Sequence, residues 1–264
     1  MRPSPRSNRL TLVLVPAAVV ILIVAGIGIG RRTTTSPNGR PFDDPGPATI
    51  TPAQSANRKT YSGTQSRFFR IEERPLTKWG DYGNILQHGM TAHLGRVHGL
   101  LSLERTGPYM PPITFPGIGD VVLSSDGRKL LEASGLSGFG FQPVNKTRIV
   151  SLPWNEWDLT TGKPPEYPRS GEPEDYILER PPNAGVAEKM GDIWELVVPV
   201  TARIGRPHEI VRSFRELYVE LDSWNGADIF RGKGFGGPLV TERAKVWFEE
   251  HFGAYTRFEE FAQK

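Results

Sequence analysis

The sequence contains no cysteine. This absence excludes disulfide bonds, thiolate zinc sites and cysteine nucleophiles, and it leaves the redox compartment open. Two motifs of nucleotide-binding and hydrolytic enzymes are also missing, namely the P-loop pattern G-x-x-x-x-G-K-[ST] and the nucleophile elbow G-x-S-x-G. His208-Glu209 lacks the second histidine of the H-E-x-x-H zinc motif. No cofactor is therefore expected from these motifs.

An excess of positive charge is missing from most of the chain, although the formal net charge is +3. Residues 1–66 hold eight basic and two acidic side chains. Of the 32 basic and 29 acidic groups in total, 24 and 27 remain for residues 67–264, a net charge of −3. A domain with this balance has no electrostatic footprint for a phosphate backbone, so no nucleic-acid partner is expected.

One long hydrophobic run stands near the N-terminus. Leu10–Gly30 contains no charged residue and is flanked by Arg9 and by Arg31-Arg32. A helix of this length spans the hydrocarbon core of a bilayer, so residues 1–30 are predicted to be a membrane anchor. A cleaved signal peptide is the alternative, because basic residues precede the run. The length of the run favours the anchor, with the body of the chain outside the cytoplasm.

The remainder divides into a linker and a folded body. Residues 31–66 are rich in Ser, Thr, Pro, Gly and Asn, which predicts a disordered linker. Residues 67–264 alternate short strand patterns with short helix patterns, which predicts one α+β globular domain. No run of βαβ units is long enough for a doubly wound sheet.

Two similar units occur within the body, at residues 121–144 and 238–261, with a constant offset of 117 residues. Val122 then matches Leu239, Ser124 matches Thr241, Leu131 matches Phe248 and Phe141 matches Phe258. Each unit reads as a strand, a Ser or Thr helix cap, a short helix and an aromatic strand. Leu130 and Leu131 are expected to form the buried face of the first helix, and Gly135 to end it in the left-handed conformation. Because the matching positions are caps and apolar residues, the repeat is predicted to be scaffolding.

Other segments predict further elements. "RFFRIEE", residues 67–73, and "IWELVVPV", residues 193–200, read as strands. Asn183 is a candidate cap for a brief helix that ends at Gly191. Residues 209–221 fit both periods and are predicted to be a helix that enters a strand.

Two patterns resemble ligand sites. His88, His93 and His98 recur every five residues, a spacing that places neighbouring histidines on different faces of a helix or strand, so no metal site is expected unless a loop brings them together. "GKGFGG" matches G-x-G-x-x-G at Gly232, Gly234 and Gly237. Pro238 and a short strand follow instead of a helix, which favours a tight backbone approach over dinucleotide binding.

The connection at residues 153–183 contains seven prolines together with aromatic and acidic side chains. Aromatic anchors beside acidic groups are typical of protein-binding surfaces, while tryptophans can equally fasten such a loop to the core. A third reading is a carboxylate-dependent hydrolase of envelope carbohydrate that uses Asp158, Glu172 or Asp175. No catalytic residue is assigned. The candidate partner-binding residues are Trp154, Trp157, Asp158, Glu172, Glu174 and Asp175.

Several of these stretches resemble bacterial toxin-immunity proteins of the double-CXXCG-motif type. They are "VLSSDGRKLLEASGLSGFGFQPV" from Val122, "RFFRIEE" with the following Lys78–Gly80, and "VTERAKVWFEEHFGAYTRFEE" from Val240. The resemblance implies a non-enzymatic protein that neutralises a cognate toxin by binding it. The two CXXCG pairs are absent here, so the zinc knuckle of that family does not carry over.

Overall fold

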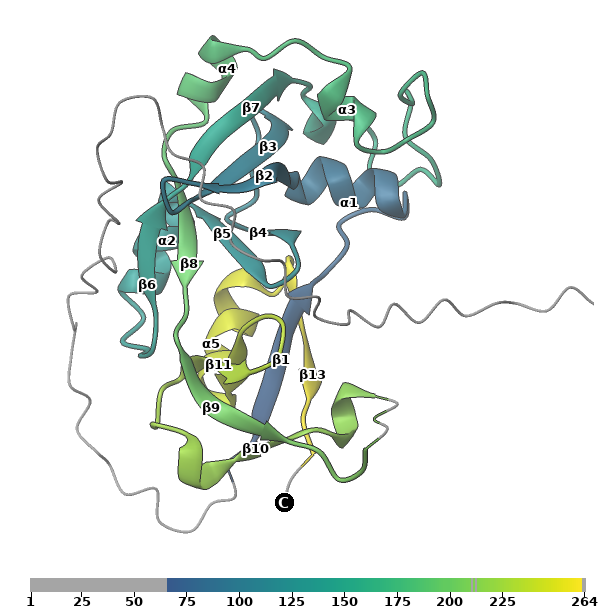
Figure 1. Cartoon of the computed structure of the whole chain (residues 1–264). Helices are drawn as coiled ribbons and strands as arrows, with labels where there is room; N and C mark the ends of the chain where they lie inside the picture. The colour runs from purple at the N-terminus through teal and green to yellow at the C-terminus, as the bar shows by residue number, and fades with distance from the viewer. Residues whose placement is uncertain (1–65, 210, 212, 263–264) are drawn as a thin grey trace, which may run out of the picture. The chain divides into compact units, whose positions relative to one another are not determined.

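The computed structural model describes residues 66–209, 211 and 213–262, which all belong to one compact unit (Figure 1). Their mixture of strands and helices confirms the α+β class. The predicted anchor, residues 10–30, and nearly all of the predicted linker lie outside the described residues. Within the described part of the chain, no helix has the length and apolar character needed to cross a membrane.

The strands form three sheets. The six-stranded sheet has the order β10 (Tyr218–Glu220), β9 (Val200–Gly205), β11 (Ile229–Lys233), β12 (Leu239–Thr241), β1 (Phe68–Glu73), β13 (Thr256–Glu260). The four-stranded sheet has the order β4 (Ile113–Gly117), β5 (Asp120–Ser124), β8 (Ile193–Val197), β6 (Gly140–Pro143). The three-stranded sheet has the order β2 (Met90–Val97), β3 (Leu100–Gly107), β7 (Asn145–Ser151). The helices are α1 (Asp81–His88), α2 (Ser125–Glu132), α3 (Asp175–Leu178), α4 (Ala184–Lys189) and α5 (Glu242–Phe252).

Both repeat units form the expected strand, capped helix and strand. The Gly127 N–H donates to Ser124 Oγ at 3.1 Å, and the Ala244 N–H donates to Thr241 Oγ1 at 3.3 Å. These bonds satisfy one free N–H at the start of each helix. Leu131 and Phe248 are both fully buried. Leu130 is 39% exposed, so the prediction that it is buried is wrong. Consecutive residues of a helix point about 100° apart, so Leu130 turns away from the core that Leu131 faces.

The repeat extends beyond the two units, because each one encloses a strand from the other half of the chain. β8 lies between β5 and β6, and β1 lies between β12 and β13. The first half runs through β1, the β2–β3 and β4–β5 hairpins, α2 and β6. The second half has the same order with β8, the β9–β10 and β11–β12 pairs, α5 and β13, while α1 and β7 of the first half have no counterpart in it. Each half therefore donates its first strand to the sheet of the other half.

The strand pairings show that the two sheets are built in the same way around their inserted strands. In both sheets the inserted strand is antiparallel to its two neighbours. Ser124 lies opposite Ile193, and the matching Thr241 lies opposite Phe68. On the other side, Leu196 lies opposite Phe141, as Ile71 lies opposite Phe258. The offset of 117 residues thus holds for the strands on both sides of each inserted strand.

The main core lies between the exchanged elements. It joins Ile71 of β1 and Leu196 of β8 to Leu131 of α2 and Phe248 of α5, all of them buried. Asp228 adds a polar link between the halves, since its carboxylate accepts hydrogen bonds from Ser137, Thr241 and Arg243. The side chain of Asp228 is buried, and these four donated bonds offset the cost of desolvating its charge.

Other local predictions have mixed outcomes. Asn183 caps α4, accepting from the Val186 N–H at 3.0 Å, and α4 ends before Gly191 as expected. Gly135, after α2, has the expected left-handed conformation with φ 69°. The strand expected at residues 193–200 ends at Val197, because Pro199 has no N–H for a ladder bond. The helix expected within residues 209–221 is wrong: the described residues of this segment form the 3-10 turn Phe214–Glu216 and β10, and Leu221 begins a second 3-10 turn, Leu221–Ser223.

The exchange predicts that the two halves remain together after the chain is cut between them. Gly162 is exposed and has open space around it, so a protease site inserted there is expected to be tolerated. After cleavage the fragments should co-elute in gel filtration and separate only in denaturant, because each one holds the central strand of a sheet completed by the other. Neither fragment expressed alone should give a cooperative unfolding transition. Separation of the cut fragments under native conditions would contradict the exchange.

Candidate functional site

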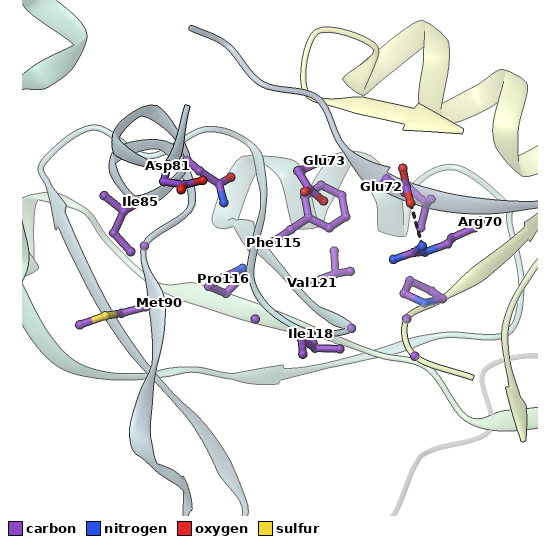
Figure 2. A pocket seen from close by; sticks show the side chains of 18 of the residues that line it. Arg70, Glu72, Glu73, Asp81, Ile85, Met90, Phe115, Pro116, Ile118 and Val121 are labelled. Carbon is purple, nitrogen blue, oxygen red and sulfur yellow. Dashed lines mark ion pairs between the residues drawn. The ribbon is translucent and has the colours of Figure 1, made fainter. Parts of the chain in front are cut away.

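A groove of about 490 Å³ lies where all three sheets meet (Figure 2). β1 borders it on one side, and α1 and the first residue of β2 border it on another. The turn between β4 and β5, the segment Gly236–Pro238 and the loop residues Pro173 and Glu174 complete its wall. Segments separated by more than 100 residues in sequence therefore form one surface, called the acidic groove below.

The charge of the acidic groove is strongly negative. Its charged lining residues are one arginine, Arg70, and four carboxylates, Glu72, Glu73, Asp81 and Glu174, a net charge of −3. Glu72 is neutralised locally by Arg70 at 2.9 Å and by Arg257 at 3.0 Å. The Arg70 guanidinium also lies over the Phe214 ring, 4.4 Å from its centroid, so it is held by several contacts at once.

Three carboxylates of the groove have no such neutralisation. Within the described residues, no basic side chain forms an ion pair with Glu73, Asp81 or Glu174. In Figure 2, Glu73 and Asp81 lie on the same side of Phe115 and Pro116. Asp81 and Glu174 are exposed and Glu73 is half-buried, and all three line the same groove.

An apolar strip lies beside these carboxylates. Its members Ile85, Met90, Phe115 and Val121 are buried or half-buried, whereas Ile118, at the tip of the β4–β5 turn, is 98% exposed. Counted with the offset of 117 residues that relates β5 to β12, Ile118 matches Phe235 in the second half. Phe235 is half-buried and packs edge-on against the rings of Phe214 and Phe261. The same turn position is therefore covered in one half and open in the other.

The glycine-rich motif "GKGFGG" forms part of the groove wall and is not followed by a helix, since β12 comes next. Gly119 has φ 79°, and a Cβ on it would lie 2.7 Å from the Gly237 nitrogen. Gly237 has φ 89°, so both positions favour glycine for the close approach of the two turns. The expected tight backbone approach is confirmed.

His88 lies behind the groove, fully buried at the end of α1. Its Nδ1 accepts a hydrogen bond from the Phe115 N–H at 3.2 Å, so the ring supports the backbone of β4. Burial, with a smaller effect of the Arg105 charge, lowers the pKa of His88 to about 3. His98 is exposed in the β2–β3 turn, and the described residues contain no cluster of three potential metal ligands.

The loop residues predicted to bind a partner are not all at the surface. Trp154 is fully buried against Trp79, Leu152 and Tyr176, so its side chain fastens the loop to the core and is not available to a partner. Trp157 is half-buried in the same cluster. The prediction was wrong for Trp154 because an indole in a Pro-rich loop has the same sequence signature whether it faces inward or outward.

The acidic residues of the loop lie in three different environments. Asp158 is exposed and accepts hydrogen bonds from the N–H and hydroxyl of Thr160, which lower its pKa. Asp175 accepts from the Ser170 hydroxyl at 2.5 Å, within the loop. Glu172 is exposed, and of the predicted residues only Glu174 lines the groove.

Sequence reasoning missed a second polar cluster next to the groove. Glu195 is buried and forms a bidentate pair with Arg96, with distances of 2.5 and 2.8 Å, and it accepts a third bond from Gln142. Burial raises the pKa of Asp120, and the neighbouring Glu195 charge adds to this effect, against Arg96 and Arg231. No local sequence motif predicts this cluster, because its members come from different strands.

Comparison with known proteins finds no protein-family model and no curated protein that matches this chain.

The buried His88 predicts a specific acid sensitivity. Its folded pKa of about 3 lies below its ordinary value of 6.5, so between these limits the unfolded chain binds a proton that the folded chain does not. The free energy of unfolding should fall with decreasing pH below 6.5, by up to ~1.4 kcal/mol per pH unit from this group. Denaturant unfolding at pH 4 and 7 should show a smaller pH difference for His88→Asn. His98→Asn is the exposed control, and equal pH differences in all three proteins would refute the assignment.

Asp120 predicts an effect of the opposite kind. Because its folded pKa is raised, its ionised form costs stability at neutral pH, and the cost disappears when pH falls below its ordinary value. Asp120→Asn should therefore raise the unfolding midpoint at pH 7 and leave it unchanged near pH 3, where both states are protonated. Asp192→Asn at an exposed site is the matched control. Destabilisation by Asp120→Asn at pH 7 would contradict the prediction.

Proposed function

We propose that residues 67–264 form a non-enzymatic protein-binding module, held at a membrane by residues 10–30, with the body outside the cytoplasm. The observation that carries this proposal is the acidic groove, where Glu73, Asp81 and Glu174 converge from three segments without a basic partner among the described residues. Mutual repulsion of unpaired carboxylates is unfavourable, and an arriving positive group relieves it. The N-terminal turn of α1 favours the charge of Asp81, and Glu174 precedes α3, but no ion pair among the described residues neutralises either carboxylate.

Two physical properties of the groove support a protein partner. Unpaired surface charge of one sign accelerates encounter with an oppositely charged partner and discriminates against others. Ile118, beside this charge, supplies an exposed apolar side chain of the kind that anchors an interface once it is buried. A basic toxin neutralised by this chain fits both properties, in line with the resemblance to toxin-immunity proteins.

The alternative, a carboxylate-dependent hydrolase, has less support. Asp158 and Asp175 are hydrogen-bonded to side chains of their own loop, and Glu172 is exposed outside the groove lining. A glycosidase requires two carboxylates placed on opposite sides of a scissile bond. None of the three residues expected to perform hydrolysis lines the groove.

A site-specific photo-crosslinker tests the binding proposal. Benzoylphenylalanine placed at Ile118 of the full chain, expressed in its own host, should yield a discrete protein adduct after irradiation. The same group at Val246, an exposed apolar position on α5 outside the groove lining, is the matched control and should yield no such adduct. Absence of an adduct at position 118, or the same adducts from both positions, would overturn the proposal.

The immunity function has a second readout. The protein captured at position 118, when expressed without this chain, should arrest growth, and co-expression of the chain should restore it. Restoration should be lost with the triple variant Glu73→Gln, Asp81→Asn, Glu174→Gln. It should persist with a triple change at the exposed residues Glu132, Glu188 and Glu250. A captured protein that is harmless on its own would refute the immunity function and leave protein binding in place.

A further inference from the structure

We propose that the acidic groove recognises an extended segment of its partner in which Lys or Arg side chains flank one apolar residue. This inference rests on the proposed function and names the chemistry of the bound segment. The first argument is charge. Three carboxylates of the groove lining have no ion-pair partner among the described residues, and the arginine that lines the groove is already engaged with Glu72 and Phe214. A positive partner gains three new ion pairs, whereas an acidic partner meets repulsion and no available cation in the lining.

The second argument concerns the form of the segment. A volume of about 490 Å³ accommodates a few side chains, and it is bounded by segments from all three sheets. The unpaired carboxylates come from β1, α1 and the loop, so a short extended stretch with cationic groups at intervals can reach more than one of them. A single cation would satisfy only one of the three positions.

Recognition depends on side chains rather than on strand addition. β4 is an edge strand of its sheet and borders the groove, which invites an added strand. The Phe115 N–H, however, already donates to His88, and Pro116 has no N–H. The two central residues of this edge therefore offer no free backbone donor. Charge and apolar contact remain as the means of selecting a partner.

We infer the apolar residue of the bound segment from Ile118 and the apolar strip next to it. Ile118 is 98% exposed, and it lines the groove together with Ile85, Met90 and Phe115. The matched Phe235 is covered by its own half of the chain, so the turn itself does not require an exposed apolar side chain. An apolar side chain of the partner placed on this strip would cover Ile118 in the same way.

Gly236 provides a way to change the charge of the groove without removing any of its residues. It lines the groove, is exposed and has no positive φ, and a Cβ on it would lie 3.5 Å from Ile118 Cγ2, an ordinary contact. Gly236→Lys therefore adds a cation to the wall, and Gly236→Ala is its steric control. Gly185, exposed at the start of α4 with similar space around it, gives the same charge change outside the groove in Gly185→Lys.

The test uses the full chain in nanodiscs of uncharged phosphatidylcholine, with empty nanodiscs as background. The probes are fluorescein-labelled peptides: Lys-Ser-Lys-Leu-Lys-Ser-Lys, its counterpart with Glu for every Lys, and its counterpart with Ser for Leu. Fluorescence polarisation should detect the first peptide only, with binding that weakens as salt rises. Gly236→Lys should weaken binding by about tenfold or more, a change of ~1.4 kcal/mol. Gly236→Ala and Gly185→Lys should bind as the unchanged protein does.

The outcomes separate this inference from the proposed function. Equal binding of the basic and acidic peptides, or equal binding by Gly236→Lys and Gly236→Ala, would overturn the basic-segment inference. A crosslinked partner at position 118 would then still support protein binding. Equal binding of the Leu and Ser peptides would remove the apolar residue from the recognised pattern. If Gly236→Lys fails to unfold cooperatively, Glu73→Gln with Glu174→Gln serves instead and should cause a comparable loss.

Discussion

The constraint on which the rest of the structure depends is the exchange of strands β1 and β8, each of which lies between two strands of the other half. A strand between two neighbours has both edges paired, and here each neighbour comes from the opposite half of the chain. Neither half can complete its sheet alone, so the two sheets form together or not at all. The shared core follows from this, because Ile71 and Leu196 of the exchanged strands pack in one cluster with Leu131 and Phe248 of the two helices. We therefore expect the two halves to fold and unfold in one cooperative transition.

The same constraint places the groove. Because the two halves interlock, the β4–β5 turn lies against the segment before β12. Gly119 is so close to Gly237 that a Cβ on Gly119 would lie 2.7 Å from the Gly237 nitrogen. β1 crosses from its own half into the other sheet, which brings Glu73 to this junction. The proline-rich loop then closes the site, because Trp154 and Tyr176 fix it to α1 and Trp79 and leave Glu174 at the rim. The buried tryptophan contributes to the site by positioning the loop.

Local patterns were sufficient for the repeat units and insufficient for their pairing. Ser124, Thr241 and Asn183 could be recognised as caps because a cap depends on a few neighbouring residues. The exchange could not be predicted from the sequence. No local pattern indicates that β8, and not β1, is the strand that pairs with β5. The groove was missed for the same reason: Glu73 and Asp81 lie about 100 residues from Glu174 and belong to unremarkable segments. Residues 209–221 were misread because their apolar residues fit both the helical and the strand period.

Divergence between the halves identifies which parts of the repeat carry more than structure. The caps and the buried helix positions serve the same purpose in both copies. Among the matched positions that differ, Ile118 is exposed where Phe235 is half-buried, and Arg70 on β1 occupies the place of Glu195 on β8. Glu195 is closed off by Arg96 and Gln142, whereas Arg70, Glu72 and Ile118 line the groove. Both differences fall at the groove or beside it. The two halves thus share their caps and buried helix positions, while these two differences lie at or beside the groove.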